Sequence, residues 1–159
     1  MEPRITNPAM SVPGAMDALQ ALSAAASAAA RAAGLPPTTA ELVNLRASQI
    51  NGCAVCLDMH SRGARKAGET DERLHTLAAW RDSPYFSGAE RAALALTEAA
   101  TRLADRANPV PDDVFAAAAK HYDEPALAAL VVSIAAINAW NRLNVATGQV
   151  AGQWTEQWA

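Results

Sequence analysis

The stretch that decides the fold of this chain is NGCAVCLDMH, which runs from Asn51 to His60. It begins with an Asn-Gly pair, and glycine readily takes the left-handed backbone conformation that ends a helix. The pair therefore predicts the end of one helix near residue 51. Cys53 is expected to open the next helix, which continues to about Lys66 and stops at Gly68. The only two cysteines of the chain thus fall in the first turn of a helix.

Helical patterns extend from this stretch toward the N-terminus. An alanine-rich run predicts a helix over 15–33, with Gly34 as its stop. The segment after it contains Thr38 and Glu41 in the spacing of a capping box. In a capping box, the side chain of the N-cap residue accepts the backbone N–H three residues on, and the glutamate there accepts the backbone N–H of the N-cap residue. We therefore expect Thr38 to be the N-cap of the helix that ends at the Asn-Gly pair.

Toward the C-terminus, four more helices are expected. The first is a short helix over 71–81 with Thr70 as its cap, and the second begins at a capping box of Ser87 and Glu90 and extends to about residue 106. The third helix covers 112–122, and the last covers 125–147 with Asp123 as its cap. The last helix is apolar on more than one side, which predicts that it lies at the buried centre. Because no strand-like alternation occurs, we predict an all-α, single-domain helical bundle.

The chain ends differ in composition from this helical region. Residues 1–14, rich in proline and polar residues, are predicted to form an N-terminal arm, 15–147 the helical domain and 148–159 a C-terminal tail. The tail carries Trp154 and Trp158, which have no core left to join within their own segment. We expect them to pack on a neighbouring subunit, so the protein is predicted to be a homo-oligomer.

Composition excludes several classes of function. The chain has 159 residues, enough for one domain, with 51% hydrophobic but only 5% aromatic residues. Its net charge is −3 and it has no Lys/Arg run, which argues against a nucleic-acid partner. The start of the chain lacks the apolar region of a secretory signal, and the most apolar run covers only residues 126–137. We therefore predict a cytoplasmic protein with no membrane partner, because a membrane span needs about 20 apolar residues.

The two cysteines and one histidine have spacings that bring them to one face of a helix. Cys56 lies three residues after Cys53, and His60 lies four residues after Cys56. The positive end of the helix dipole favours a thiolate at Cys53, whereas an imidazole one turn further on favours a thiolate at Cys56. A second thiol nearby resolves an oxidised sulfur into a disulfide before over-oxidation. The pattern thus predicts a thiol–disulfide redox centre.

Other interpretations of the same residues stay open. The cysteines can be two small buried residues, and His60 can lie on a solvated face. A zinc site needs four ligands, and only Glu41 is available to complete Cys53, Cys56 and His60. The capping box gives Glu41 a purely structural role. His75 and His121, far from the motif, are interpreted as surface or capping residues.

Polar residues on two of the predicted helices also have structural interpretations. Asn138 and Asn141 fall on one side of the last helix, where buried asparagines need hydrogen-bond partners and fix register or line an interface. Ser48 lies on the same side of its helix as Glu41, and a helix–helix contact is its plainer explanation.

The motif resembles the alkyl hydroperoxidase D (AhpD) core of the carboxymuconolactone decarboxylase-like superfamily. That family has Glu, eleven residues, Cys-x-x-Cys, three residues and His, and Glu41, Cys53, Cys56 and His60 match every spacing. Softer similarity continues into 62–68, 80–86 and 90–94, so the resemblance covers roughly residues 35–145. This chain departs from the best-known members at Val55, where they have a histidine between the cysteines.

The resemblance implies a helical fold, assembly as trimers or hexamers, and peroxidase or disulfide-reductase activity. It implies Cys56 as the peroxidatic thiol, Cys53 as the resolving thiol, and His60 with Glu41 as a proton relay. The predicted function is reduction of a hydroperoxide, with recycling by a dithiol or lipoyl-type partner and with no metal or organic cofactor. The alternatives are a non-enzymatic helical oligomer or redox sensor with structural cysteines, and a metal-binding protein.

Overall fold

The computed structural model describes residues 1–104 and 106–152, and over these residues it contains helices and no strand. The elements in chain order are α1 (Pro8–Ser11), α2 (Ala15–Ala32), α3 (Pro37–Asn51), α4 (Ala54–Lys66), α5 (Asp71–Thr76), the 3-10 helix η1 (Leu77–Ala79), α6 (Gly88–Thr101), α7 (Asp112–Ala119) and α8 (Glu124–Thr147). The all-α prediction is confirmed.

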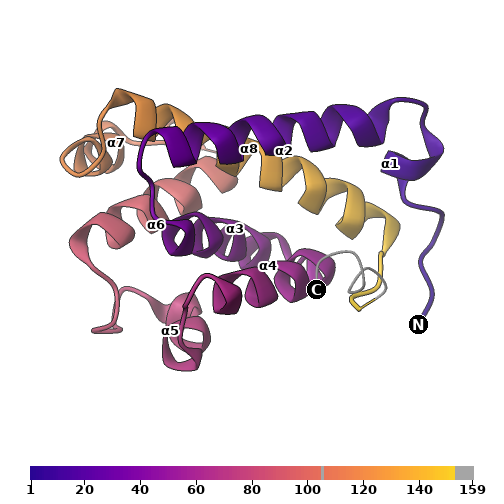
Figure 1. Ribbon diagram of the computed structural model, residues 1–159, viewed down its shortest axis with the longest axis horizontal. Helices are drawn as coiled ribbons and strands as arrows, with labels where there is room; N and C mark the ends of the chain where they lie inside the picture. Colours follow the sequence, from indigo (N-terminus) through magenta and orange to yellow (C-terminus); the bar gives the residue numbers. More distant parts are fainter. Residues whose placement is uncertain (105, 153–159) are drawn as a thin grey trace.

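Helix α3 lies at the centre of the bundle and contacts α4, α6 and α8. In Figure 1, α2 runs along the top of the view beside α8, while α4 and α5 lie at the bottom. One buried cluster joins α3, α6 and α8 through Val43, Leu96 and Leu130. A second cluster, around Leu42 and Leu77, joins α3 to the segment that follows α4.

The end of α3 is the break that the sequence predicts. Gly52 takes a left-handed backbone (φ +69°) as the C-cap, and its N–H bonds to the carbonyl of Ser48. The predicted caps Thr70, Ser87 and Asp123 are confirmed, each accepting a hydrogen bond from the backbone N–H three residues on. Local sequence alone determines these helix ends because each cap uses only neighbouring residues.

The predicted capping box at Thr38 is wrong. Helix α3 already begins at Pro37, with Pro36 as the N-cap and no side-chain cap. Proline is favoured in the first helical position because it has no N–H to leave unpaired and its φ is preset. Thr38 therefore lies inside the helix, and Glu41 is free to bond elsewhere.

Three helices end earlier than expected. The helix predicted over 71–81 ends as α5 at Thr76 and continues only as the 3-10 helix η1 to Ala79. Helix α6 stops at Thr101 rather than near 106, because Arg102 leaves the helical backbone (φ −97°, ψ 58°). Helix α7 stops at Ala119 rather than 122, and the Tyr122 hydroxyl donates instead to the carbonyl of Ala89. The chain then enters the Asp123 cap of α8 at once.

Helix α8 packs against α2, α3 and α6, but only one of its sides is buried, so the prediction that it lies at the buried centre holds for that side alone. Val131, Val132 and Val145 are 43%, 37% and 42% exposed, while Leu130 and Ile134 are buried. By length and composition alone α8 could cross a membrane, but 56% of its most apolar window is buried within the fold. Core helices of soluble proteins pass the same test, and α8 packs against α2, α3 and α6 as such a helix does.

The segment predicted as an N-terminal arm contains α1 and contacts the C-terminal end of α8. The Arg4 N–H donates to the carbonyl of Thr147 at 2.8 Å, and its guanidinium donates to the carbonyl of Ala146 at 3.0 Å. The Gln149 amide donates back to the carbonyl of Ile5. Carbonyls at the end of a helix have no partner within it, so this segment satisfies part of that need. Trp154 and Trp158 lie outside the described residues.

One carboxylate connects three parts of the bundle. Glu98 of α6, whose side chain is 8% exposed, accepts hydrogen bonds from Arg46 of α3 at 2.7 Å, from the Trp80 indole at 2.9 Å and from Arg81 at 2.9 Å. Burial opposes the ionisation of Glu98, but these donors outweigh it and lower its pKa to about 2. The ionised carboxylate therefore holds α3 and the segment after α5 against α6.

Candidate functional site

The two cysteines lie together at the start of α4. Cys53 is the N-cap, and its Sγ accepts the N–H of Cys56 at 3.4 Å. The two Sγ atoms are 2.7 Å apart, and both residues are free cysteines. Cys53 is 1% exposed and Cys56 3%, within a cluster formed by Ala47, Val55 and Ile137. A disulfide can therefore form here with little movement of the backbone.

The surroundings of the two sulfurs favour ionisation of Cys53. The largest effect on Cys53 is the hydrogen bond that its sulfur accepts from the Cys56 thiol, which lowers the pKa. Burial of Cys53 raises the pKa, while hydrogen bonds from the Cys56 N–H and the Asn144 amide lower it further. The net result is a pKa of about 6 for Cys53. The pKa of Cys56 is raised, first because its thiol proton bonds to Cys53, then by burial and by the charge on Cys53. The structure therefore favours Cys53 as the thiolate, first because of the Cys56 thiol and then because of the Cys56 N–H at the start of α4.

The second pair of predicted site residues also meets. Nδ1 of His60 on α4 lies 2.7 Å from Oε2 of Glu41 on α3, and both side chains are partly buried. Because Glu41 does not cap α3, its carboxylate is free to orient the imidazole. In carboxylate–histidine pairs of this kind the carboxylate fixes the ring and its tautomer.

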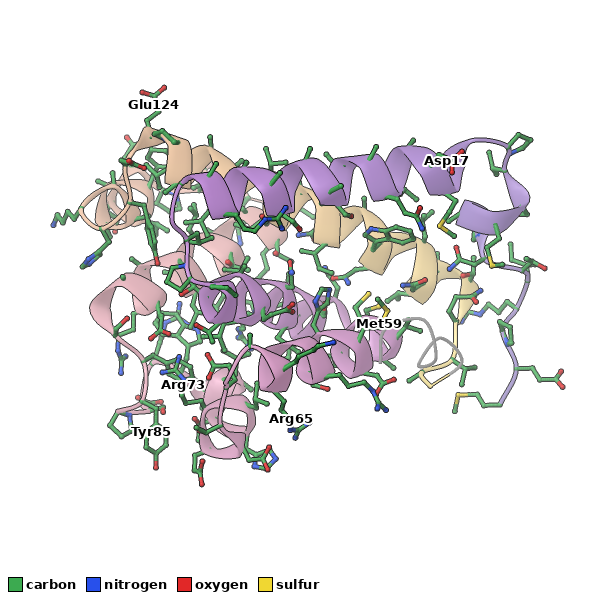
Figure 2. The ribbon with its side chains drawn as sticks, viewed as in Figure 1. Asp17, Met59, Arg65, Arg73, Tyr85 and Glu124 are labelled. Carbon is green, nitrogen blue, oxygen red and sulfur yellow. The ribbon has the colours of Figure 1, made fainter. Side chains whose placement is uncertain are left out.

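The predicted convergence of His60 with the cysteines is only partial. His60 lies one helical turn after Cys56 on α4, yet no hydrogen bond joins its ring to either sulfur. Met59 and Trp140 pack against the cysteine cluster, and Figure 2 labels Met59 on the part of α4 that faces α8. The site thus consists of a sulfur pair at the start of α4 and, one helical turn further along α4, His60 bonded to Glu41 of α3.

Sequence reasoning missed the role of Gly63 in the site. A Cβ at Gly63 would come within 2.8 Å of Oε1 of Glu41, so a larger residue here would displace this carboxylate from its present position between α3 and α4. A glycine in a helix interior is destabilising and points to a close approach of some kind. Gly63 lies three residues after His60, and that spacing is the signal that would have found it.

Sequence reasoning also missed Asn144 at the sulfurs. Asn144 lies on the last turn of α8, and its amide nitrogen is 3.4 Å from Sγ of Cys56 and 3.7 Å from Sγ of Cys53. The signal was present in the sequence, because Asn144 continues the three-residue spacing of Asn138 and Asn141.

The other two asparagines of α8 bond to α3 and α6. Asn141 donates to the Ser48 hydroxyl, and Asn138 to the Thr101 hydroxyl. Asn51 at the end of α3 donates to both asparagines at 2.9 Å. Both asparagines therefore fix the register of α8, as interpreted, and Ser48 has the predicted helix–helix role.

The remaining candidates lie elsewhere. His75 and His121 are exposed, as expected, and Trp80 is buried in the core. Within residues 1–104 and 106–152, no group of three or more His, Cys, Asp or Glu side chains is placed to hold a metal ion. The groups that meet at the candidate site are two thiols, an imidazole, a carboxylate and the Asn144 amide.

Comparison with known proteins identifies relatives of the chain. The model of the carboxymuconolactone decarboxylase family matches residues 13–99, more than half of the chain. The Bacillus subtilis protein YdfG, uncharacterised, is 45% identical over 114 residues, which are 72% of this chain and 76% of YdfG. The uncharacterised Escherichia coli protein YnjA is 34% identical over 113 residues, 70% of this chain and 60% of YnjA.

Solved structures share the fold. A protein of unknown function from Agrobacterium tumefaciens, suggested to be the antioxidant defence protein AhpD, matches with a TM-score of 0.84 and 35% identity, over 94% of this chain and 98% of its own. The debrominase Bmp8, bound to a tribromopyrrole, matches with a TM-score of 0.75 and 21% identity, over 92% and 75%. The chain thus belongs to the carboxymuconolactone decarboxylase family, as a member of its AhpD-like type.

Proposed function

We propose that this protein reduces hydroperoxides with the Cys53–Cys56 pair. The observation that carries the proposal is the contact of the two buried sulfurs, 2.7 Å apart, with the pKa of Cys53 lowered to about 6. A thiolate present at neutral pH is the nucleophile that peroxide chemistry requires. The suggested antioxidant identity of the Agrobacterium protein points to the same class of reaction.

In the first step, the Cys53 thiolate attacks one oxygen of the peroxide bond. The O–O bond breaks, the alcohol leaves, and Cys53 becomes a sulfenic acid. In the second step, Cys56 displaces the sulfenic oxygen as water and forms the disulfide. One of the two protons consumed comes from the Cys56 thiol and the other from solvent. An external dithiol, such as a lipoyl-bearing partner, supplies two electrons to restore both thiols.

In this scheme Cys53 attacks and Cys56 resolves, the reverse of the order that the resemblance implies. The raised pKa of Cys56 means that its thiol needs a base before it can attack the sulfenic acid. His60, held by Glu41 one turn further along α4, is the base in the scheme.

The test is peroxide consumption by the reduced protein with excess dithiothreitol. We expect repeated turnover by the native chain, and none when both cysteines are serine. After removal of the dithiothreitol, Cys56→Ser is expected to consume one equivalent and stop at a sulfenic acid that dimedone traps. His60→Ala is expected to slow turnover by about a hundredfold, because general acid–base catalysis contributes ~10²–10⁴.

Exposed His75 provides the control for the loss of an imidazole, and His75→Ala is expected to turn over at the native rate. A single oxidation of the native chain without turnover would favour the redox sensor instead. Turnover that survives both serine replacements would contradict the proposal.

We also propose that the protein is a cytoplasmic homo-oligomer, a trimer or hexamer as the resemblance implies. The exposed valines of α8, Val131, Val132 and Val145, are apolar residues that a second copy would cover. A reducing compartment suits a catalyst that must start each cycle with two thiols.

A charged residue in place of one of the exposed valines of α8 is expected to dissociate this oligomer. Val131→Asp would have to bury a carboxylate between subunits, so its mass by light scattering should fall toward that of one chain. Tyr85→Asp, at an exposed position outside α8, is the control and should keep the native mass. A native chain that is monomeric at micromolar concentration would contradict the proposal.

A further inference from the structure

We propose that Asn144 is a further residue of the redox site, which stabilises the first thiolate by donating a hydrogen bond, and that Asn7 holds it in the donating orientation. The effect on turnover rests on the proposed function, whereas the effect on the sulfurs does not. Asn144 would be a catalytic residue, because its amide contacts the reacting atoms. Asn7 would be a positioning residue that acts through Asn144.

The contacts form one continuous chain of hydrogen bonds. The Asn144 amide nitrogen lies 3.4 Å from Sγ of Cys56 and 3.7 Å from Sγ of Cys53. The Asn144 oxygen accepts from the Asn7 amide at 2.9 Å, and the Asn7 oxygen accepts from the N–H of Ala9 at 3.0 Å. Asn7 and Asn144 are both buried, so water does not compete for these groups.

These hydrogen bonds allow only one orientation of the Asn144 amide, which contacts the sulfurs. The two ends of an asparagine amide have almost the same shape, so their orientation follows from their partners. The N–H of Ala9 can only donate, and it therefore faces the oxygen of Asn7. The nitrogen of Asn7 then faces Asn144, whose oxygen must accept. The NH₂ group of Asn144 is left pointing at the sulfurs.

A donor in this place favours the charged form of the pair. A buried thiolate loses the hydration it had in water, and hydrogen bonds from N–H groups replace part of that loss. Arg4 bonds to the end of α8, Arg142 bonds to Asn138, and Glu41 bonds to His60, so none of these charged groups hydrogen-bonds to a sulfur. The stabilisation of the thiolate therefore comes from neutral donors: the Cys56 thiol first, then the Cys56 N–H and the Asn144 amide, with a smaller contribution from Asn141.

Asn7 is itself held in place by its neighbours. The backbone of Arg4 and Ile5 bonds to Thr147 and Gln149 at the end of α8, and Asn7 caps α1. The segment thus cannot shift without breaking several bonds at once. Through Asn7, a stretch of chain nearly 50 residues before the cysteines acts on their ionisation.

The test is the pH profile of iodoacetamide alkylation of the reduced full-length protein, with the modified cysteine identified by mass spectrometry. Asn144→Leu removes the donor at similar volume and is expected to raise the midpoint by about one pH unit, as a hydrogen bond to a charged group is lost. Asn138→Leu is the control for a buried asparagine of α8 that contacts neither sulfur, and should leave the midpoint unchanged.

Asn7→Asp is the sharper variant. A carboxylate still accepts from Ala9 but cannot donate to Asn144, so the Asn144 amide is expected to turn and present its oxygen to the sulfurs. The midpoint should rise by at least one pH unit, more than for Asn7→Ala, while thermal melting shows a folded protein. Ser11→Ala, which removes only a hydroxyl bonded to the Asn7 carbonyl, should behave as the native chain.

The outcomes separate the two proposals. An unchanged midpoint in both Asn144→Leu and Asn7→Asp would overturn the inference, even if the native protein turns over peroxide. A raised midpoint in Asn144→Leu alone would overturn the role of Asn7. If Asn144→Leu does not fold, Asn7→Asp decides. A protein without any peroxide turnover but with both midpoints raised would overturn the proposed function and leave this inference standing.

Discussion

Cys53 in the Cys56→Ser variant is expected to be mostly thiolate at neutral pH, whereas Cys56 in Cys53→Ser is expected to be at least about thirtyfold less ionised. The serine hydroxyl in the first variant still donates to Sγ of Cys53, whose pKa is about 6 in the native site. In the second variant, burial keeps the pKa of Cys56 at or above the ~8.5 of a free thiol. Thiolate absorbance in the ultraviolet, titrated over pH, measures both.

Access to solvent does not separate the two thiols, because Cys53 and Cys56 are 1% and 3% exposed. The double serine variant provides the background absorbance. The pH midpoint is the quantity to compare, since the reactivity of a thiolate toward any reagent also depends on its basicity. A lower midpoint for Cys56 than for Cys53 would reverse the assignment and agree with the order that the family resemblance implies.

Replacing Glu98 by glutamine is expected to lower the free energy of unfolding by about 3 kcal/mol, because a buried ion pair that loses one partner leaves the other charge uncompensated. Arg46, 11% exposed at its side chain, would remain buried opposite a neutral amide. Urea denaturation followed by circular dichroism measures the change. Glu2→Gln, at an exposed position, is the control and should stay within about 0.5 kcal/mol of the native chain.

The Glu98 carboxylate also makes the free energy of unfolding depend on pH in the acid range. The pKa of Glu98 is depressed to about 2 in the folded protein, against about 4.3 in an unfolded chain. Its contribution is therefore fully present above about pH 4.3 and is lost as the pH falls toward 2. The Glu98→Gln protein should lack this component, so its stability should fall less steeply over that range. Parallel curves for the two proteins would contradict this account.

The helix ends were predictable where local signals agreed. At Gly52 and Ser87 every signal points the same way, and both are confirmed. At Thr38 two signals compete, and the Pro-Pro pair before it begins α3 at Pro37. The exposed side of α8 was not predictable from its own sequence, because an apolar stripe has the same composition whether its own fold or another copy covers it.

The candidate site was predictable to the extent that it lies within one helix. The placement of both thiols in the first turn of α4 follows from the motif spacing and from the break before it. The Glu41–His60 contact depends on how closely α3 and α4 approach at Gly63, and the bond from Asn144 to Cys53 joins residues 91 apart. Contacts over such separations depend on tertiary packing, about which a local pattern contains no information.

The bond between Asn7 and Asn144 joins residues 137 apart, almost the length of the chain. Closing a loop of that size costs entropy that local contacts do not repay, so such contacts form late in folding. During synthesis on the ribosome, the N-terminal segment and the cysteines emerge long before α8 exists to receive them. We therefore expect the thiols of a nascent or partly folded chain to keep the ordinary pKa of about 8.5, and the pKa of Cys53 to fall only when the whole domain has closed.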